Sequence, residues 1–302
     1  MVVQRVRRPT LDEMNLPIGK KTRLHRILYE HGPGQGVALI LPIDQGLEHG
    51  PVDFFANPDS ADPEFQLKLC LEGGYSAVAF HYGIAAKHMR PYAGKVPLIL
   101  KLNGKTNIPS DSQAFSGLTG AVEDGVRLGA DAVGYTLYVG SPRQADDMRQ
   151  LTEIRRACDE YAMPLVVWSY PRGEAVDKKG GRDSLYAVDY AARVAAEMGA
   201  DIVKLNVPEF DEKSQASSPK PYNTIQLSHR EAVERVVRSA GRTLVLFSGG
   251  SKMGDQDLLQ KARECMEAGA VGLIFGRNMW QRAMPDALRI TAELKRIMLE
   301  SA

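Results

Sequence analysis

The 302-residue sequence has few cysteines, no long apolar run and almost no net charge. Its three cysteines, Cys70, Cys158 and Cys265, lie far apart in helical patterns, which favours reduced, packed thiols over disulfides or metal ligation. The longest apolar runs, such as residues 37–43, have the length of a strand, and no apolar region follows the basic N-terminus. We therefore expect a soluble, cytosolic protein that has no membrane partner.

The low net charge and the scattered histidines exclude further classes of function. A net charge of +1 gives no general attraction to nucleic acid, so any basic site must be local, and phosphates remain possible as small ligands. His49, His81 and His88 lack the spacing of a metal site. We expect no metal and no other cofactor, and we interpret His49 as a residue that contacts the substrate or supports one that does.

What the sequence does contain is a repeated pattern, in which a helix rich in Ala, Leu, Glu and Arg ends at a glycine and an apolar strand follows. Tight loops from a helix to a strand require such a glycine. The pattern occurs at Gly73, Gly129, Gly199 and Gly269. Together with strands that begin after a proline or a glycine, it predicts eight strands, over residues 37–43, 76–81, 97–102, 131–138, 164–170, 201–207, 243–247 and 271–275.

Apolar strands separated by helical stretches predict an α/β fold with a parallel sheet. Eight such units favour a single (β/α)8 TIM barrel, with an open doubly wound sheet as the alternative. We assign residues 1–36 to an N-terminal lead-in segment and residues 37–302 to the barrel, as the catalytic domain. The long polar linker 208–227 is either a lid or a surface insertion, and Ser228 and Glu231 after it fit a capping box.

Lys204 stands out because it lies in the middle of the apolar strand 201–207. Side chains alternate across a strand, so Lys204 shares a face with Asn206 and lies opposite the apolar Val203. A buried lysine tends to lose its proton, and a neutral amine can attack a carbonyl to form a Schiff base. The strand therefore indicates imine chemistry at Lys204.

The site of such a barrel lies at the carboxyl ends of its strands, where polar residues follow several of the predicted strands. Tyr170 could serve Lys204 as a general acid or base, and Asp44 could accept a substrate proton or stabilise the iminium. Lys101 and Arg172 are cations that would lower the pKa of Lys204. The alternative is that Lys204 and Asp44 form an ion pair inside the barrel.

The last two predicted strands run into turns that contain glycine. Glycine lets the backbone approach a ligand closely, and helix starts present free N–H groups to anions. The two turns, with the cations Lys252 and Arg277, predict a phosphate site. The residues concerned are Ser248, Gly249, Gly250 and Ser251 after the seventh strand and Gly276 and Arg277 after the eighth.

Residues 41–50, 168–173, 202–206 and 248–251 closely resemble class I fructose-bisphosphate aldolases of the archaeal and bacterial type, and the resemblance extends from about residue 20 to the C-terminus. It implies a barrel enzyme that reversibly cleaves fructose 1,6-bisphosphate to dihydroxyacetone phosphate and glyceraldehyde 3-phosphate without a metal. It also implies a sugar phosphate as the small-molecule partner, a role in glycolysis and gluconeogenesis, and assembly as a homo-oligomer, often a decamer.

The resemblance assigns roles to single residues. Lys204 would be the Schiff-base lysine, Tyr170 the proton-transfer residue and Asp44 the catalytic carboxylate. Trp168 would form a wall of the site, and Arg172 would contact the second phosphate. The phosphate cradle nearest the imine would comprise Gly249, Gly250, Ser251, Gly276 and Arg277, and we add Lys101, Ser248 and His49 to the expected binding residues.

Other functions share these motifs. Relatives with the same lysine and tyrosine transfer carbon units in aromatic amino-acid precursor synthesis or process a phosphorylated quorum-sensing signal. Arg172 favours the bisphosphate among these substrates. Paired phosphate turns also suit a flavin oxidoreductase barrel or a non-catalytic sugar-phosphate sensor.

Overall fold

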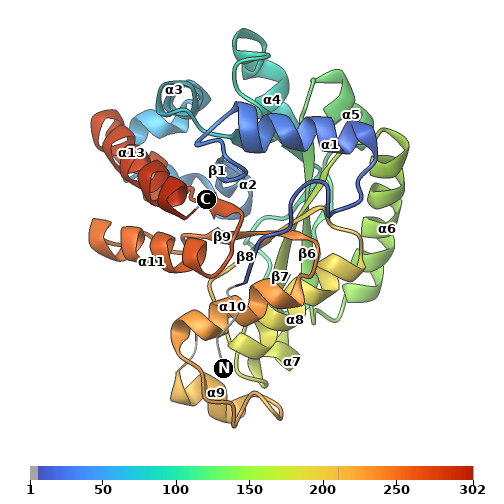
Figure 1. Cartoon of the computed structure of the whole chain (residues 1–302). Helices are drawn as coiled ribbons and strands as arrows, with labels where there is room; N and C mark the ends of the chain where they lie inside the picture. Colours follow the sequence, from blue (N-terminus) through green and yellow to red (C-terminus); the bar gives the residue numbers. More distant parts are fainter. Residues whose placement is uncertain (1–5, 210, 302) are drawn as a thin grey trace.

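The computed structural model describes residues 6–209 and 211–301, and its central feature is a closed barrel of eight parallel strands. Around the barrel the strands follow the order β1, β10, β9, β8, β7, β6, β3 and β2. Helices cover the barrel from outside (Figure 1). The predicted (β/α)8 TIM barrel is therefore confirmed, and the open doubly wound sheet is wrong.

The barrel strands agree with the predicted ones to within two residues at each end. They are β1 (Ala38–Pro42), β2 (Ala77–His81), β3 (Leu98–Lys101), β6 (Ala132–Val139), β7 (Leu165–Pro171), β8 (Ile202–Leu205), β9 (Leu244–Ser248) and β10 (Gly272–Ile274). The sequence pattern does not predict the small antiparallel sheet of β4 (Asn103–Gly104) and β5 (Gly117–Leu118), because strands of two residues leave no periodicity to read.

Glycines end several of the helices as the repeated pattern predicts. Gly129, Gly199 and Gly269 adopt φ values of 67°, 90° and 94°, a region that favours glycine. In the first copy Gly73 is the last residue of α3, and the next residue, Gly74, adopts this conformation with a φ of 62°. The α-helices are α1 (Ile18–His25), α2 (Gln45–Glu48), α3 (Pro63–Gly73), α4 (Tyr82–His88), α5 (Val122–Arg127), α6 (Gln144–Glu160), α7 (Glu174–Asp177), α8 (Leu185–Glu197), α9 (Glu212–Ser217), α10 (His229–Ser239), α11 (Asp255–Glu267), α12 (Arg277–Trp280) and α13 (Met284–Glu300). A π-helical turn, Arg26–Glu30, continues α1.

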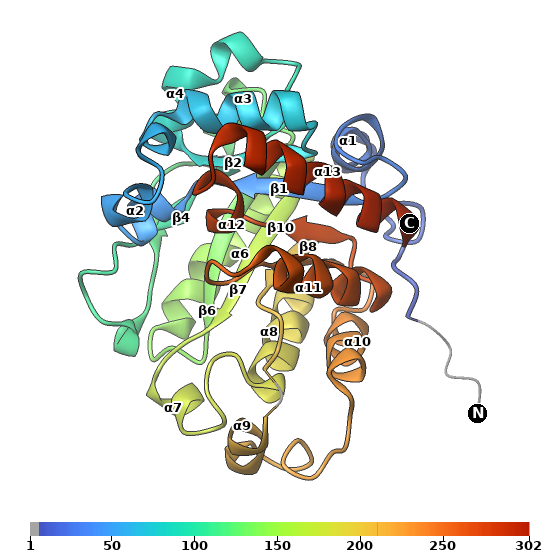
Figure 2. The same ribbon diagram turned by 90° about the vertical axis from the view of Figure 1, so that its left-hand side faces the viewer.

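The N-terminal segment closes one end of the barrel. Leu24 and Ile27 are fully buried and belong to the same apolar cluster as the barrel interior. Lys20 forms an ion pair with Asp201 at 3.0 Å, and Asp201 follows the glycine turn that leads into β8. Figure 2 shows α1 and the C-terminus at this end and α2 at the opposite end. The division into a lead-in segment and a barrel domain stays a prediction, and residues 1–5 and 302 lie outside the described residues.

The linker 208–227 contains a short helix of its own, α9, and Phe210 within it lies outside the described residues. Tyr222 Oη donates a hydrogen bond of 2.6 Å to Asp189 on α8, which ties the linker to the helical layer. The predicted capping box is confirmed, because Ser228 Oγ accepts from the N–H of Glu231 and the Glu231 carboxylate accepts from the N–H of Ser228. Whether the linker acts as a lid stays a prediction.

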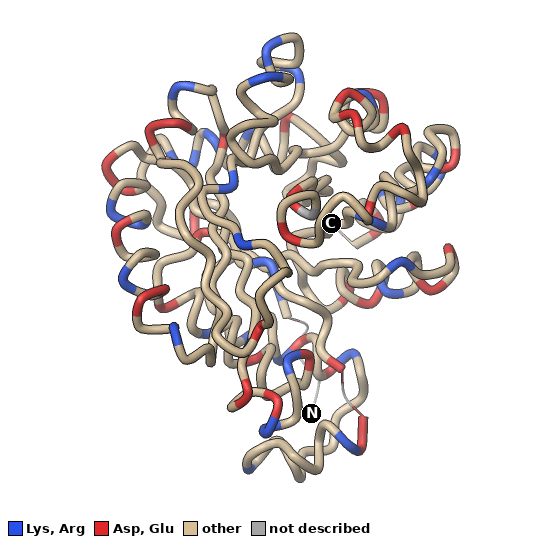
Figure 3. The backbone as a smooth tube through the Cα atoms, turned by 180° about the vertical axis from the view of Figure 1, so that it is seen from behind, with Lys and Arg blue, Asp and Glu red and all other residues tan. Residues whose placement is uncertain are grey.

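The surface and the core agree with the composition. Figure 3 shows basic and acidic residues interspersed along the helices in that view. Cys70, Cys158 and Cys265 are buried, and burial raises the pKa of each thiol. Among the described residues, no helix is both long and apolar enough to cross a membrane.

Candidate active site

A cleft of about 740 Å³ opens at the carboxyl ends of the barrel strands. It brings together all the predicted site residues except Lys101 and Lys252. They are Asp44, His49, Trp168, Tyr170, Arg172, Lys204, Ser248, Gly249, Gly250, Ser251, Gly276 and Arg277. The positions follow from the parallel register, since the carboxyl ends of all eight strands meet at one end of the barrel.

Lys204 lies on the floor of this cleft. It is 6% exposed and pairs in register with Trp168 on β7, while its neighbour Val203 packs outward against the helices, as the alternation predicts. Lys204 Nζ donates a hydrogen bond to Tyr170 Oη and lies 4.2 Å from the centre of the Tyr170 ring. Burial lowers the pKa of Lys204 to about 7, with help from the positive charges of Lys101 and Arg172.

A second buried lysine, Lys101, holds the carboxylates beside Lys204. Its Nζ lies 3.1 Å from Asp44, 3.3 Å from Glu48 and 2.7 Å from the hydroxyl of Thr136. Burial alone would lower the pKa of Lys101, but Glu48 and Asp44 raise it. The alternative interpretation paired Asp44 with Lys204. Among the described residues, Asp44 forms its ion pair with Lys101. Lys101 itself is fully buried, which does not fit its predicted contact with substrate.

A glycine inside β6 makes room for Lys101. A Cβ at Gly134 would lie 2.7 Å from the Trp168 ring and 2.8 Å from Cδ of Lys101. The space lets Lys101 Nζ lie 4.4 Å from the centre of the Trp168 ring. Gly134, Thr136 and Glu48 are site residues that the sequence reasoning missed, although a glycine in the middle of a strand is a recognised sign of close packing.

The two acid–base groups near Lys204 have opposite ionisation states. Burial alone would raise the pKa of Asp44, but Lys101, His81 and Lys204 hold it below its usual value, so Asp44 is a carboxylate at neutral pH. Burial, together with Asp44 and Glu48, raises the pKa of Tyr170 well above its usual value, so its phenol keeps its proton. The site thus has a base and an acid beside an amine that is partly neutral at neutral pH.

On one side of Lys204, the glycine turn after β9 is held open by side-chain contacts. Gly250 has a φ of 71°, and a Cβ there would meet no atom within 4 Å. Asn278 is 1% exposed, donates to the carbonyl of Ser251 at 3.1 Å and accepts from the N–H of Met253 at 3.0 Å. Arg277 donates to the carbonyl of Gly250 at 3.4 Å. The turn therefore keeps a fixed shape that exposes its backbone to a ligand.

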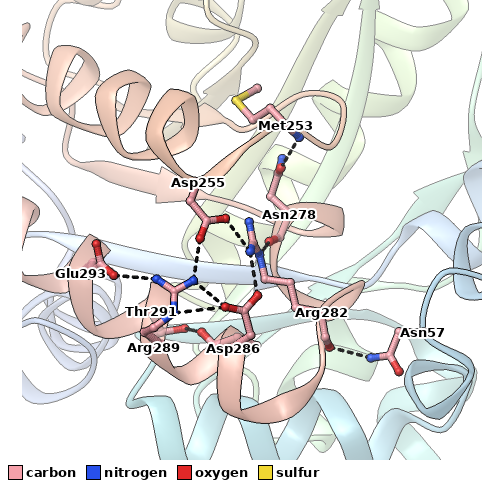
Figure 4. Close-up of polar contacts among 10 residues, drawn as sticks. Asn57, Met253, Asp255, Asn278, Arg282, Asp286, Arg289, Thr291 and Glu293 are labelled. Atoms are coloured by element: carbon pink, nitrogen blue, oxygen red, sulfur yellow. Dashed lines mark hydrogen bonds and ion pairs between the residues drawn. The ribbon is translucent and has the colours of Figure 1, made fainter.

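A network of charged side chains holds Asn278 in place. Figure 4 shows Asn278 directed toward Met253, with Arg282 between Asp255 and Asp286. Arg282 donates to the carbonyl of Asn278 at 2.6 Å and lies 2.7 Å from Asp255. The network links the start of α11 to α12 and α13, which positions the turn after β9 relative to the turn after β10.

On the other side of Lys204 lies a group of cations that sequence reasoning found only in part. Arg172 donates from Nε to Asp111 at 3.1 Å, and its guanidinium lies 5.2 Å from the centre of the Tyr170 ring. Lys105 and Arg182 also line this part of the cleft and face Asp111. These residues come from loops, where no strand periodicity marks a residue as directed inward.

The outcome differs between two other predicted residues. Lys252 is exposed and does not belong to the cleft lining, where Lys261 of α11 is found instead. His49 lies in the lining and its Nδ1 is 2.8 Å from Asp53. In the described ranges, no group of three His, Cys, Asp or Glu side chains is arranged to hold a metal ion.

Comparisons with known proteins agree with this geometry. The DeoC/LacD family aldolase description matches residues 38–282. The chain is 41% identical over 265 residues to a fructose-bisphosphate aldolase class 1 of Thermoproteus tenax, covering 87% of this chain and 90% of that protein. It is 31% identical over 284 residues to a 2-amino-3,7-dideoxy-D-threo-hept-6-ulosonate synthase of Halobacterium salinarum, covering 94% of this chain and 93% of that protein.

A solved structure shares both the fold and the chemistry suggested by Lys204. It is an archaeal fructose-1,6-bisphosphate aldolase whose catalytic lysine is covalently bound to the carbinolamine intermediate of the substrate. It superposes with a TM-score of 0.77 at 38% identity and covers 92% of this chain and 98% of that chain. The barrel, the buried lysine and the match over residues 38–282 lead to one conclusion: the chain belongs to the DeoC/LacD family of aldolases.

Proposed function

We propose that this protein is a class I fructose-bisphosphate aldolase, which reversibly cleaves fructose 1,6-bisphosphate to dihydroxyacetone phosphate and glyceraldehyde 3-phosphate without a metal. The observation that carries the proposal is the buried Lys204, because a pKa of about 7 leaves much of its amine neutral at physiological pH. The names of the relatives at 41% and 38% identity support the same substrate.

In the first proposed step, the neutral Nζ of Lys204 attacks the ketone carbon of the open-chain sugar. The nitrogen passes one proton to the carbonyl oxygen to give a carbinolamine, and the new hydroxyl takes a second proton from solvent and leaves as water, which gives an iminium. Trp168, which is 1% exposed and lies across the register from Lys204, forms a wall beside this carbon. Such burial shields the imine from bulk water.

In the second proposed step, Asp44 accepts the proton of the C4 hydroxyl. The C3–C4 bond breaks, its electron pair passes to the iminium to form an enamine, and the C4 fragment leaves as glyceraldehyde 3-phosphate. Tyr170 then donates its phenolic proton to C3, and hydrolysis of the new iminium frees dihydroxyacetone phosphate and Lys204. Proton exchange with solvent restores Asp44 and Tyr170, whose ionisation states match these roles.

We place the two phosphates on opposite sides of Lys204. The phosphate nearer the imine binds the turns after β9 and β10, where the backbone around Gly250 is open and Arg277 adds a positive charge. Ser248 reaches the same turn and donates to Asn206 at 2.8 Å. The second phosphate binds Arg172, next to the proton donor Tyr170.

Trapping of the imine tests the proposal. Borohydride added with dihydroxyacetone phosphate should reduce the imine to a stable secondary amine, and peptide mass spectrometry should find the adduct on Lys204. Lys204→Met should give no adduct, and a chelator should leave cleavage of fructose 1,6-bisphosphate unchanged. A wild-type protein that forms no adduct, or one that the chelator inactivates, would overturn the proposal.

The substrate is tested with a panel of phosphorylated ketoses, because one relative is named as a 2-amino-3,7-dideoxy-D-threo-hept-6-ulosonate synthase. Fructose 1,6-bisphosphate should show the highest kcat/KM. We also propose that the enzyme works in the cytoplasm as a homo-oligomer, which in the family is often a decamer. Light scattering on the purified protein measures that assembly.

A further inference from the structure

A carboxylate already occupies the side of the cleft that carries Arg172. Asp111 lies 2.8 Å from Lys105 Nζ, 3.1 Å from Arg172 Nε and 4.0 Å from Arg182 Nη1. The three cations come from three separate segments, after β4, after β7 and after α7. All four side chains line the same cleft as Lys204.

The charges in this group do not balance. Among the described residues, Asp111 and Asp183 are the carboxylates within 4.0 Å of the three cations, and Asp183 also accepts a hydrogen bond from Asn206. Without Asp111, three positive charges would face one negative charge. The excess of two positive charges equals the charge of a phosphate monoester dianion, whose three oxygens can each accept a hydrogen bond.

Asp111 follows the exposed stretch of the loop between β4 and β5. The loop joins β4 to β5 and is held at its base by the β4–β5 pairing and by Ser141, which donates to the carbonyl of Ala114 at 2.6 Å. Between these points residues 106–110 are exposed, with Ile108 88% exposed. Figure 2 shows this loop projecting at the end of the barrel where α2 and α7 lie. Asn107 at the tip donates to the carbonyl of His49 at 3.2 Å, so release of Asp111 also requires this exposed hydrogen bond to break while the base stays in place.

Each cation, by contrast, has a support that does not involve Asp111, and for Lys105 it is the carbonyl of Thr106, to which Nζ donates at 3.2 Å. Arg172 donates from Nη1 to its neighbouring carbonyl, Pro171 O, at 2.8 Å, and packs over the Tyr170 ring. Arg182 lies 3.7 Å from Asp183. Burial alone would raise the pKa of Asp111, but Lys105 and Arg172 hold it below its usual value, so Asp111 is ionised at neutral pH. A charged competitor therefore occupies a preformed group of cations.

We propose that Lys105 and Arg182 complete the site for the second phosphate with Arg172, and that Asp111 occupies this site until the substrate phosphate displaces it. The inference rests on the proposed function, since it concerns the substrate of the same cleft. Lys105 and Arg182 are specificity residues that bind the phosphate remote from the imine. Asp111 is an internal competitor, and its removal should strengthen the binding of a bisphosphate.

Kinetics on fructose 1,6-bisphosphate and on fructose 1-phosphate, which lacks the second phosphate, test the inference. Lys105→Met and Arg182→Met should each lower kcat/KM for the bisphosphate at least about tenfold, because each removes a charge-assisted hydrogen bond, and should leave kcat/KM for the monophosphate unchanged. Asp111→Asn should lower the KM for the bisphosphate about three- to tenfold and leave the monophosphate unaffected. The controls are Asp177→Asn on α7 and Lys178→Met directly after it, which make the same kinds of substitution at exposed residues. They should leave KM and kcat/KM unchanged for both substrates.

The direction in which KM and kcat/KM change distinguishes the inference from its alternatives. A rise in the KM for the bisphosphate in Asp111→Asn would mean that Asp111 orders the cations and does not compete, and it would overturn the inference. Equal losses on both substrates in Lys105→Met and Arg182→Met would do the same. Trapping of dihydroxyacetone phosphate at Lys204 needs no second phosphate, so it should persist in every variant and shows independently whether the proposed function holds.

Discussion

Each end of the barrel buries a lysine, and the two lysines differ in their acid–base properties. At the end closed by the N-terminal segment Lys20 is 3% exposed, and at the cleft end Lys204 is 6% exposed. Burial alone lowers the pKa of a lysine, because the ammonium loses its hydration. Asp201 and Asp159, each 3.0 Å from Lys20 Nζ, overcome this effect and raise the pKa of Lys20, whereas the pKa of Lys204 is about 7.

The ratio of carboxylates to lysines explains the difference. At the closed end, Asp201 and Asp159 serve one lysine. At the cleft end, Asp44 and Glu48 both pair with Lys101, whose charge also disfavours a second ammonium at Lys204. Burial therefore does not decide the state of a lysine by itself. One end uses its lysine to attach the N-terminal segment, and the other keeps an amine available for chemistry.

The two ends should differ most in kcat when Lys204 and Lys20 are each replaced by arginine. Lys204→Arg keeps a positive charge but cannot form the imine, so kcat for fructose 1,6-bisphosphate should fall at least about 10⁴-fold. Lys20→Arg keeps its ion pairs and should retain kcat to within about twofold. A coupled assay for triose phosphate release measures both. If Lys204→Arg kept more than about one per cent of wild-type activity, the reaction would not proceed through an imine at Lys204.

The next largest effect should come from Tyr170→Phe, which removes the proposed proton donor at the cleft. We expect kcat to fall about 10³-fold, while dihydroxyacetone phosphate is still trapped on Lys204, because attack by the amine does not need the phenol. Tyr135→Phe is the control, since Tyr135 lies on the outside of the barrel and donates to Asp147. Loss of trapping in Tyr170→Phe would instead place Tyr170 in imine formation.

The sequence predicted the cleft end well wherever a strand supplies the residue. Alternation along 201–207 placed Lys204 inside the barrel, and the parallel register then brought Asp44 and Tyr170 to the same end. The pairing of Lys101 with Glu48 was missed, because Glu48 reaches it from the short helix α2 after β1 and no local pattern records the contact.

The closed end was less predictable. Asp131 and Asp201 are the first residues of two predicted strands, and the sequence pattern indicates no partner for either. In the structure they receive Arg26 and Lys20 from the N-terminal segment at 2.7 Å and 3.0 Å. An ion pair between residues more than one hundred positions apart depends on the whole barrel, so it follows only after the fold is known.

The role of Lys20 in attaching the N-terminal segment predicts a cost in stability without a cost in chemistry. Lys20→Met leaves the buried Asp201 without a counter-charge, and the N–H of Leu165 still donates to it, so the free energy of unfolding should fall by about 3 kcal/mol. Urea unfolding measures this, and kcat under native conditions should stay unchanged. The control is Lys21→Met, whose lysine is half exposed and pairs with the exposed Asp12, and it should change stability by less than about 0.5 kcal/mol. Equal losses in the two variants would show that burial of Lys20 adds nothing.

The smallest effect should be a shift in pH dependence when Lys101 is removed. In the wild type, trapping of dihydroxyacetone phosphate should rise as the pH passes through about 7, because the neutral fraction of Lys204 grows above its pKa. Lys101→Met frees Asp44 and Glu48 to stabilise an ammonium at Lys204 and removes a repelling charge. Both changes raise the pKa of Lys204, so the midpoint should move to higher pH by at least about one pH unit.

Borohydride trapping between about pH 5 and 9 measures this midpoint directly, with circular dichroism at each pH to confirm that the variant is folded. Lys20→Met is the matched control, since it removes a buried lysine from the other end and should leave the midpoint near 7. A midpoint that stays near 7 in Lys101→Met would show that burial alone sets the pKa of Lys204. The contrast between the two ends would then rest on the carboxylates around Lys20 and not on the competition between Lys101 and Lys204 for Asp44 and Glu48.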